Sequence, residues 1–140
     1  MTYILPRTLT LMNETITTAQ TAALKTSVSG LARASSLALY CNFTYGSSGT
    51  TAKVYVQTSF DGGTTWIDIA MFDHTTSSLA RAYNLTSTTA ITSVYTVTDG
   101  SLSSNTCKDG LIGDMLRVKF TSTGTYATTT TMQVYAIAKG

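Results

Sequence analysis

The strongest constraint on the fold is a strict alternation of apolar and polar side chains that recurs along the chain. It is clearest over residues 36–45, where Leu37, Leu39, Cys41 and Phe43 occupy every second position. Successive side chains of a β-strand point to opposite faces of a sheet, so this spacing predicts a strand with one buried face. Similar patterns predict further strands over residues 52–59, 66–72, 78–85, 91–98, 115–121 and 132–138.

The same alternation predicts which side chains face the core. In the segment 66–72 it places Ile67, Ile69 and Met71 inward. On the opposite, outward faces of other strands it places three aromatic and two basic side chains: Tyr40, Tyr55, Tyr135, Arg117 and Lys119. Outward aromatic rings suit contacts with another molecule, so we predict these five residues, together with Tyr3 near the amino terminus, as partner contacts.

Composition excludes a helical protein. The 30 threonines and 15 serines make 45 of the 140 residues, and Glu14 is the only glutamate. Threonine favours strands, whereas helices are rich in glutamate, lysine, alanine and leucine. The strand spacing lacks a β-α-β rhythm, so we predict one all-β domain over residues 1–140, an antiparallel β-sandwich with a jelly roll as the favoured topology. Residues 1–12 alternate weakly and are expected to form an extended arm or an edge strand.

Charge excludes several classes of partner. Nine Lys and Arg residues against seven Asp and Glu residues give a net charge of +2, and the basic residues are scattered. This charge distribution does not predict a nucleic-acid-binding surface. No apolar run approaches the roughly 20 residues that a membrane span needs. The amino terminus lacks the pattern of a secretory signal, so we expect the chain to be made and kept in a cytoplasm, with both cysteines reduced.

One short motif lies between two predicted strands, in the segment Ser-Phe-Asp-Gly-Gly-Thr-Thr-Trp over residues 59–66. Asp61 can accept hydrogen bonds from loop amides, and Gly62 and Gly63 adopt positive φ at little cost, so the segment predicts a tight hairpin. It resembles the Asp-box of sialidases and related β-propellers, Ser-x-Asp-x-Gly-x-Thr-Trp, which implies a structural hairpin placed away from any catalytic centre. The residues that match are Ser59, Asp61, Gly63, Thr65 and Trp66.

A wider resemblance covers residues 54–70, 114–127 and 131–138. These segments are similar to small structural proteins of tailed bacteriophages, among which jelly-roll capsid cement or decoration proteins are nearest in size and character. The resemblance implies a non-enzymatic virion protein that binds the outside of an assembled shell and stabilises joints between subunits of the major capsid protein. It also implies a homo-oligomer, a dimer or a trimer, on the capsid exterior.

Two other functions fit the sequence less well. A carbohydrate-binding module, alone or as a head or tail spike domain, would stack sugars on Trp66, Tyr40 and Tyr55. A hydrolase would have to use His74, the only histidine, which we expect in a solvated loop after a strand. No nucleophile-elbow motif accompanies this histidine, so we predict no catalytic residue.

Metal and cofactor sites find little support. Cys41, Cys107 and His74 lack the paired spacing of a zinc site. A calcium loop would have to be built around Asp99 or Asp109, and neither lies in the alternating acidic pattern that such loops show. We therefore predict neither a metal nor a cofactor.

Overall fold

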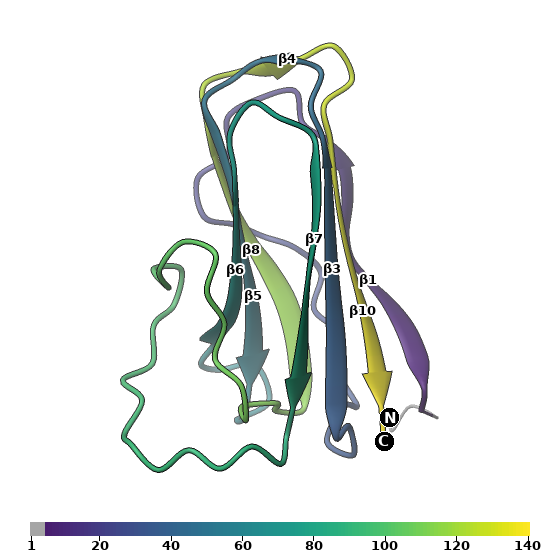
Figure 1. The fold of residues 1–140 in the computed structure, drawn as a ribbon, viewed down its shortest axis with the longest axis vertical. Coiled ribbons are helices and arrows are strands. Elements are labelled where there is room, and N and C mark those ends of the chain that lie inside the picture. The colour runs from purple at the N-terminus through teal and green to yellow at the C-terminus, as the bar shows by residue number, and fades with distance from the viewer. Residues whose placement is uncertain (1–4) are drawn as a thin grey trace.

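Two four-stranded antiparallel sheets packed face to face form the protein in a computed structural model that describes residues 5–140 (Figure 1). Sheet A has the strand order β1 (Arg7–Thr15), β10 (Thr131–Lys139), β3 (Ser36–Thr44), β7 (Leu79–Thr86). Sheet B has the order β2 (Ala23–Leu24), β8 (Met115–Thr123), β5 (Thr51–Ser59), β6 (Ile67–His74). A two-stranded ribbon of β4 (Ser47–Ser48) and β9 (Tyr126–Ala127) closes one end of the sandwich.

The core fills the space between the two sheets, and alternation along the strands produces it. Phe43 of β3, Val54 of β5, Phe120 of β8 and Val134 of β10 are each fully buried there. The predicted all-β antiparallel sandwich is therefore confirmed. The described residues contain no helix, and hence none that could cross a membrane.

In strand β6 the predicted facing is wrong beyond Ile69, because the strand contains a β-bulge. Val56 pairs with Ala70 and Gln57 pairs with Asp68, so Ile69 is an extra residue. An extra residue shifts the alternation by one position. Phe72 instead of Met71 therefore reaches the main core, and Met71 turns to the outer face of sheet B.

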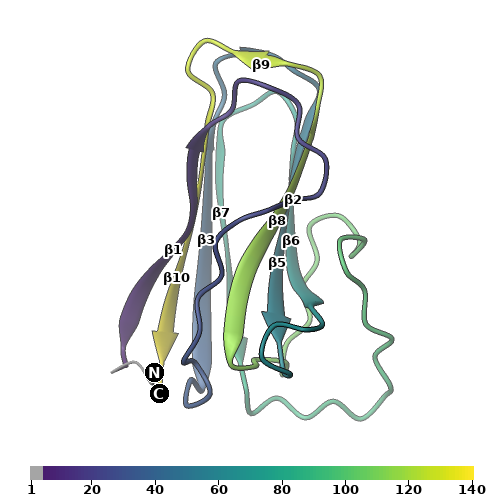
Figure 2. The same cartoon turned by 180° about the vertical axis from the view of Figure 1, so that it is seen from behind.

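The strand predicted over residues 91–98 is absent. After β7 the chain runs without a strand through residues 87–114, crosses the outer side of sheet B and returns in β8 (Figure 2). Hydrogen bonds fix its second half to β6: the amide of Asp68 donates to the carbonyl of Thr98, and that of Met71 donates to the carbonyl of Thr106. Sheet B is thus covered on both faces.

Residues 7–15 form the edge strand β1 of sheet A, which pairs with β10 of the same chain. A second bulge, between Thr10 and Met12, lets the neighbours Leu11 and Met12 both be buried. The part of the predicted arm from Arg7 onward is therefore an edge strand within the sandwich. The predicted contact Tyr3 lies outside the described residues.

Candidate functional site: the outer face of sheet A

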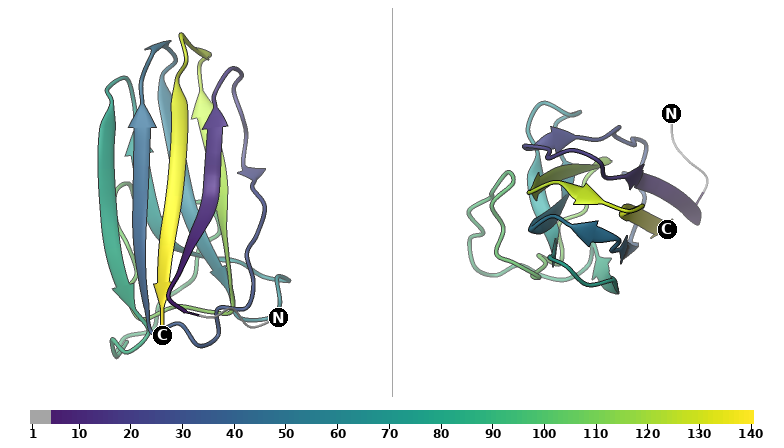
Figure 3. Two further views of the ribbon diagram at one scale, coloured as in Figure 1. Left: turned by 90° about the vertical axis from the view of Figure 1, so that its right-hand side faces the viewer. Right: turned by 90° about the horizontal axis from the view of Figure 1, so that it is seen from above.

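Sheet A leaves its outer face uncovered, in contrast to sheet B. The four strands lie side by side across this face (Figure 3). The strand register aligns the outward side chains of the middle of the sheet in three rows across the strands. From β1 to β7 these rows are Thr8–Ile137–Ala38–Asn84, Thr10–Tyr135–Tyr40–Ala82 and Asn13–Gln133–Asn42–Ala80.

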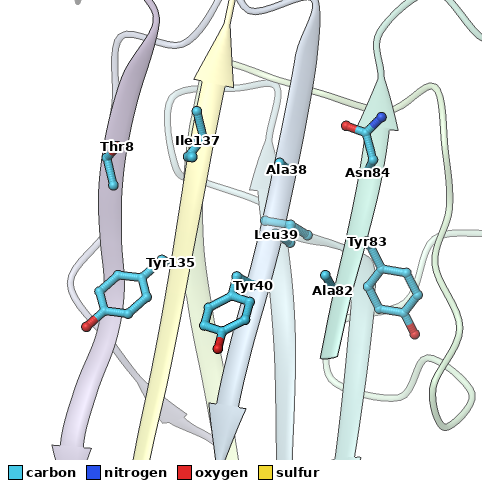
Figure 4. A pocket seen from close by; sticks show the side chains of 9 residues that line it. All are labelled: Thr8, Ala38, Leu39, Tyr40, Ala82, Tyr83, Asn84, Tyr135 and Ile137. Atoms are coloured by element: carbon cyan, nitrogen blue, oxygen red, sulfur yellow. The ribbon is translucent and has the colours of Figure 1, made fainter. Parts of the chain in front are cut away.

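None of these twelve positions carries a charge. A shallow depression of about 610 Å³ lies over the first two rows, and its floor includes Ala38 and Ala82 (Figure 4). Alanine side chains at neighbouring positions on β3 and β7 leave room there, because longer side chains would fill the depression. The depression has the shape to accept side chains of another molecule.

Two tyrosines border the depression at directly opposed positions. Tyr40 of β3 pairs with Tyr135 of β10 in the register, and their rings lie next to each other (Figure 4). Tyr40 is 43% exposed and Ile137 is 40% exposed. A tyrosine ring buries a large apolar area on contact and keeps a hydroxyl for hydrogen bonding, as is typical of protein interfaces. The structure thus brings together two of the predicted contact residues.

A third ring at the depression, Tyr83, is held by the protein itself. Its hydroxyl donates to the carbonyl of Met71, and its ring centroid lies 4.9 Å from that of Phe72. Burial raises the pKa of Tyr83. Tyr83 therefore links β7 to β6 and fixes one side of the depression.

The other predicted contacts are covered. Tyr55 is buried on the outer face of sheet B with Met71 and Leu102, because residues 98–108 cross above it. Arg117 and Lys119 are mostly buried, and the Nζ of Lys119 lies 2.7 Å from Asp99 Oδ1. Partial burial raises the pKa of Asp99, but the hydrogen bonds from Lys119 and Gln57 outweigh it and lower this pKa. These three residues hold a loop rather than face a partner.

The hairpin at residues 59–66 is closed by its own side chains. Asp61 accepts hydrogen bonds from the amide and the hydroxyl of Thr65, and Ser59 Oγ accepts one from the amide of Gly63. The indole of Trp66 donates to the carbonyl of Gly63 at 3.0 Å. Gly62 and Gly63 have φ of 73° and 95°. The hydrogen bonds from Thr65 lower the pKa of Asp61 to about 2.

A sugar-stacking platform does not form from the three candidate aromatics. The guanidinium of Arg117 lies 4.2 Å from the centre of the Trp66 ring and occupies one of its faces. Tyr55 is buried, and Tyr40 lies on the other sheet. The three side chains are therefore separated, with only Tyr40 presented on an open face.

His74 does not lie in a solvated loop, so that prediction is wrong. It ends β6, is 1% exposed, and its Nε2 lies 3.4 Å from Cys41 Sγ. Both groups are neutral, since burial lowers the pKa of His74 to about 4 and raises the pKa of Cys41 to about 12. Within residues 5–140, no three His, Cys, Asp or Glu side chains gather as a metal site would require.

The sequence did not single out the other outward residues that line the depression, Ala38, Ala82, Asn84, Ile137 and Thr8. Each occupies the outward position of its strand, and all are uncharged. Only the pairing of the four strands reveals that these positions are adjacent. No protein-family model, curated protein or solved structure matches the chain.

Proposed function

We propose that the chain is a non-enzymatic bacteriophage virion protein, a capsid cement or decoration protein that binds the outer surface of an assembled shell. The observation that carries this proposal is the open outer face of sheet A, which is uncharged across twelve aligned positions and bears Tyr40 and Tyr135. The partner in this proposal is the major capsid protein. The chain would be made in the host cytoplasm and end on the capsid exterior.

The chemistry of this face suits permanent attachment. None of the twelve aligned positions carries a charge that must lose its hydration on contact, and that loss is a large cost of burying charge. The nearest outward charge on β10 is Lys139, at the end of the strand. Alanine and threonine side chains lose little conformational entropy on contact, so more of the contact energy remains as affinity. A copy seated across a joint between two subunits adds buried surface that must be broken before the joint opens.

We also propose that the sandwich is a jelly roll. With the short ribbon β4–β9 set aside, the eight other strands in chain order lie as 1-8-3-6 in sheet A and 2-7-4-5 in sheet B. Consecutive strands thus change sheet repeatedly, and the first strand lies beside the last. Two Greek keys wound together produce this order, which supports the topology that the sequence favours.

Sedimentation with expanded shells of the cognate phage tests the proposed function. We expect the protein to co-sediment at a fixed ratio to the capsid subunits and to raise the melting temperature of the shell. If the protein stays in the supernatant at saturating concentration, the proposal is wrong. Binding without any rise in the melting temperature of the shell would contradict the proposed cementing role.

A further inference from the structure

Residues 90–97 are the part of the long loop that the rest of the chain leaves unpaired. Among the described residues, no backbone hydrogen bond joins this stretch to any other segment. The segment has the β-branched composition of a strand, Ala-Ile-Thr-Ser-Val-Tyr-Thr-Val, and its sequence predicts one. Its main chain therefore offers donors and acceptors that only water or another chain can satisfy.

The segment is nevertheless held at both ends. Before it, the side chain of Asp109 accepts hydrogen bonds from the amide of Thr86 and the hydroxyl of Thr89. After it, Thr98 donates through its hydroxyl to Asp68 Oδ2. Within it, the hydroxyl of Tyr95 donates to the carbonyl of Asp68 at 3.1 Å. These contacts tether residues 90–97 on the sheet B side of the molecule.

The exposed side chains of this segment are apolar. Val94 is 97% exposed, Val97 is 52% exposed and Ile91 is 45% exposed, and residues 88–98 carry no charge. Neighbouring apolar side chains exposed to this degree mark interaction sites on soluble proteins. Three such side chains within seven uncharged residues indicate that another protein chain covers this surface.

We propose that residues 91–97 pair antiparallel with the same segment of a second copy, about a twofold axis at Val94. Ile91 and Val97 are equally distant from Val94 in the sequence, so this register places Ile91 of each copy opposite Val97 of the other. The unpaired main-chain groups of the two copies then satisfy each other by strand addition. Neither segment carries a charge of its own, and the cation beside it is Lys108, whose Nζ lies 4.8 Å from the centre of the Tyr95 ring.

The proposed dimer leaves the capsid-docking face free. Sheet A's outer face and the loop 87–114 lie on opposite sides of the molecule (Figure 1). A ribbon of two short segments buries less than the roughly 1,200 Å² of a standard interface, so we expect a reversible dimer of modest affinity. The inference does not depend on shell binding, and free protein is sufficient to test it.

Disulfide trapping with Val94→Cys tests the axis. Directly opposed residues of an antiparallel pair have Cα atoms about 4.5–5.5 Å apart, which suits a disulfide. With diamide as the oxidant, we expect this variant to form a covalent dimer at least tenfold faster than Leu24→Cys, a control at another exposed apolar residue. The wild-type protein measures the background rate of disulfide formation through its own cysteines, the buried Cys41 and Cys107. Equal rates in the two variants would overturn the proposal.

Charge placement tests the register by sedimentation equilibrium. We expect Ile91→Lys to weaken the wild-type dimer by at least tenfold. The double variant Ile91→Lys, Val97→Glu should recover most of the loss, because the antiparallel register sets the opposite charges against each other. A wild-type chain that stays monomeric at millimolar concentration, or a dimer indifferent to Ile91→Lys, would refute this pairing. Neither result bears on shell binding, which sedimentation with shells decides separately.

Discussion

The sulfur of Cys41 lies 3.4 Å from Nε2 of His74 in the interior between the two sheets, where the His74 ring also packs 5.0 Å from that of Phe43. Burial is the main cause of the low pKa of His74, about 4 against an ordinary 6.5, and the nearby Arg81 lowers it further. The only histidine of the chain is thus a neutral core residue at neutral pH.

This histidine makes the fold sensitive to acid. Between pH 6.5 and pH 4 the unfolded chain binds a proton at His74 that the folded chain does not, so stability falls as the pH falls through this window. A pKa difference of this size corresponds to about 3 kcal/mol. Urea unfolding at pH 7, 5.5 and 4 measures the loss. We expect His74→Phe to make the free energy of unfolding less dependent on pH between pH 6.5 and pH 4, whatever the stability of the variant at pH 7. An unchanged pH dependence would show that another group titrates.

Asp68 attaches the long loop to sheet B. Its buried carboxylate accepts hydrogen bonds from the side chain of Gln57, the hydroxyl of Thr98 and the amides of Gly100, Ser101 and Leu102. Asp68→Asn replaces one acceptor by a donor that faces these amides. We expect it to lower the free energy of unfolding by about 2–4 kcal/mol and to expose residues 98–104 to protease.

A matched control for that substitution is Asp114→Asn. Asp114 accepts one side-chain hydrogen bond, from the amide of Ala32 at 3.2 Å. We expect a change below about 1 kcal/mol and no new protease site. If both variants unfold alike, the network at Asp68 does not carry the loop's attachment.

The hairpin at residues 59–66 should depend on Asp61. Asp61→Ala removes the acceptor for both the amide and the hydroxyl of Thr65, so we expect a melting temperature lower by a few degrees and altered emission from Trp66, the only tryptophan. Thr64→Ala, at an exposed neighbour in the same turn, is the control. Equal melting temperatures for the two variants would contradict this role of Asp61.

On the open face of sheet A, a buried charge should abolish docking. Ala82→Glu places a carboxylate beside Tyr40 in the second row of the face, and we expect shell binding to fall at least tenfold while the melting temperature of the free protein stays within a few degrees of wild type. The control is Ala19→Glu, which places the same charge at an exposed alanine outside both sheets. We expect this variant to bind shells as wild type does. Shells that bind both variants equally would place docking elsewhere.

Alternation in the sequence was sufficient to predict most of the core. Leu37, Leu39, Cys41 and Phe43 are all buried, as their spacing predicts, because a regular strand in a half-covered sheet presents one face inward. The prediction failed at Met71, because the bulge at Ile69 breaks the regular spacing. A bulge depends on how two strands pair, which a pattern within one strand does not reveal.

The candidate site was harder to predict, because it depends on long-range coverage. Tyr40 and Tyr55 both occupy outward positions in strong strands, and nothing local to either distinguishes them. Only the path of the loop 87–114 buries Tyr55 and leaves Tyr40 open. The same holds for Lys119, whose partner Asp99 lies in that loop.

The bulge in β1 has a consequence for how safely many copies can accumulate in one cell. An edge strand with a free row of main-chain groups is a template on which further chains can add without limit, and a bulge bends and twists such an edge away from flat pairing. The irregularity between Thr10 and Met12 sits on the free edge of sheet A. The bulge therefore protects the chain against edge-to-edge growth into fibres.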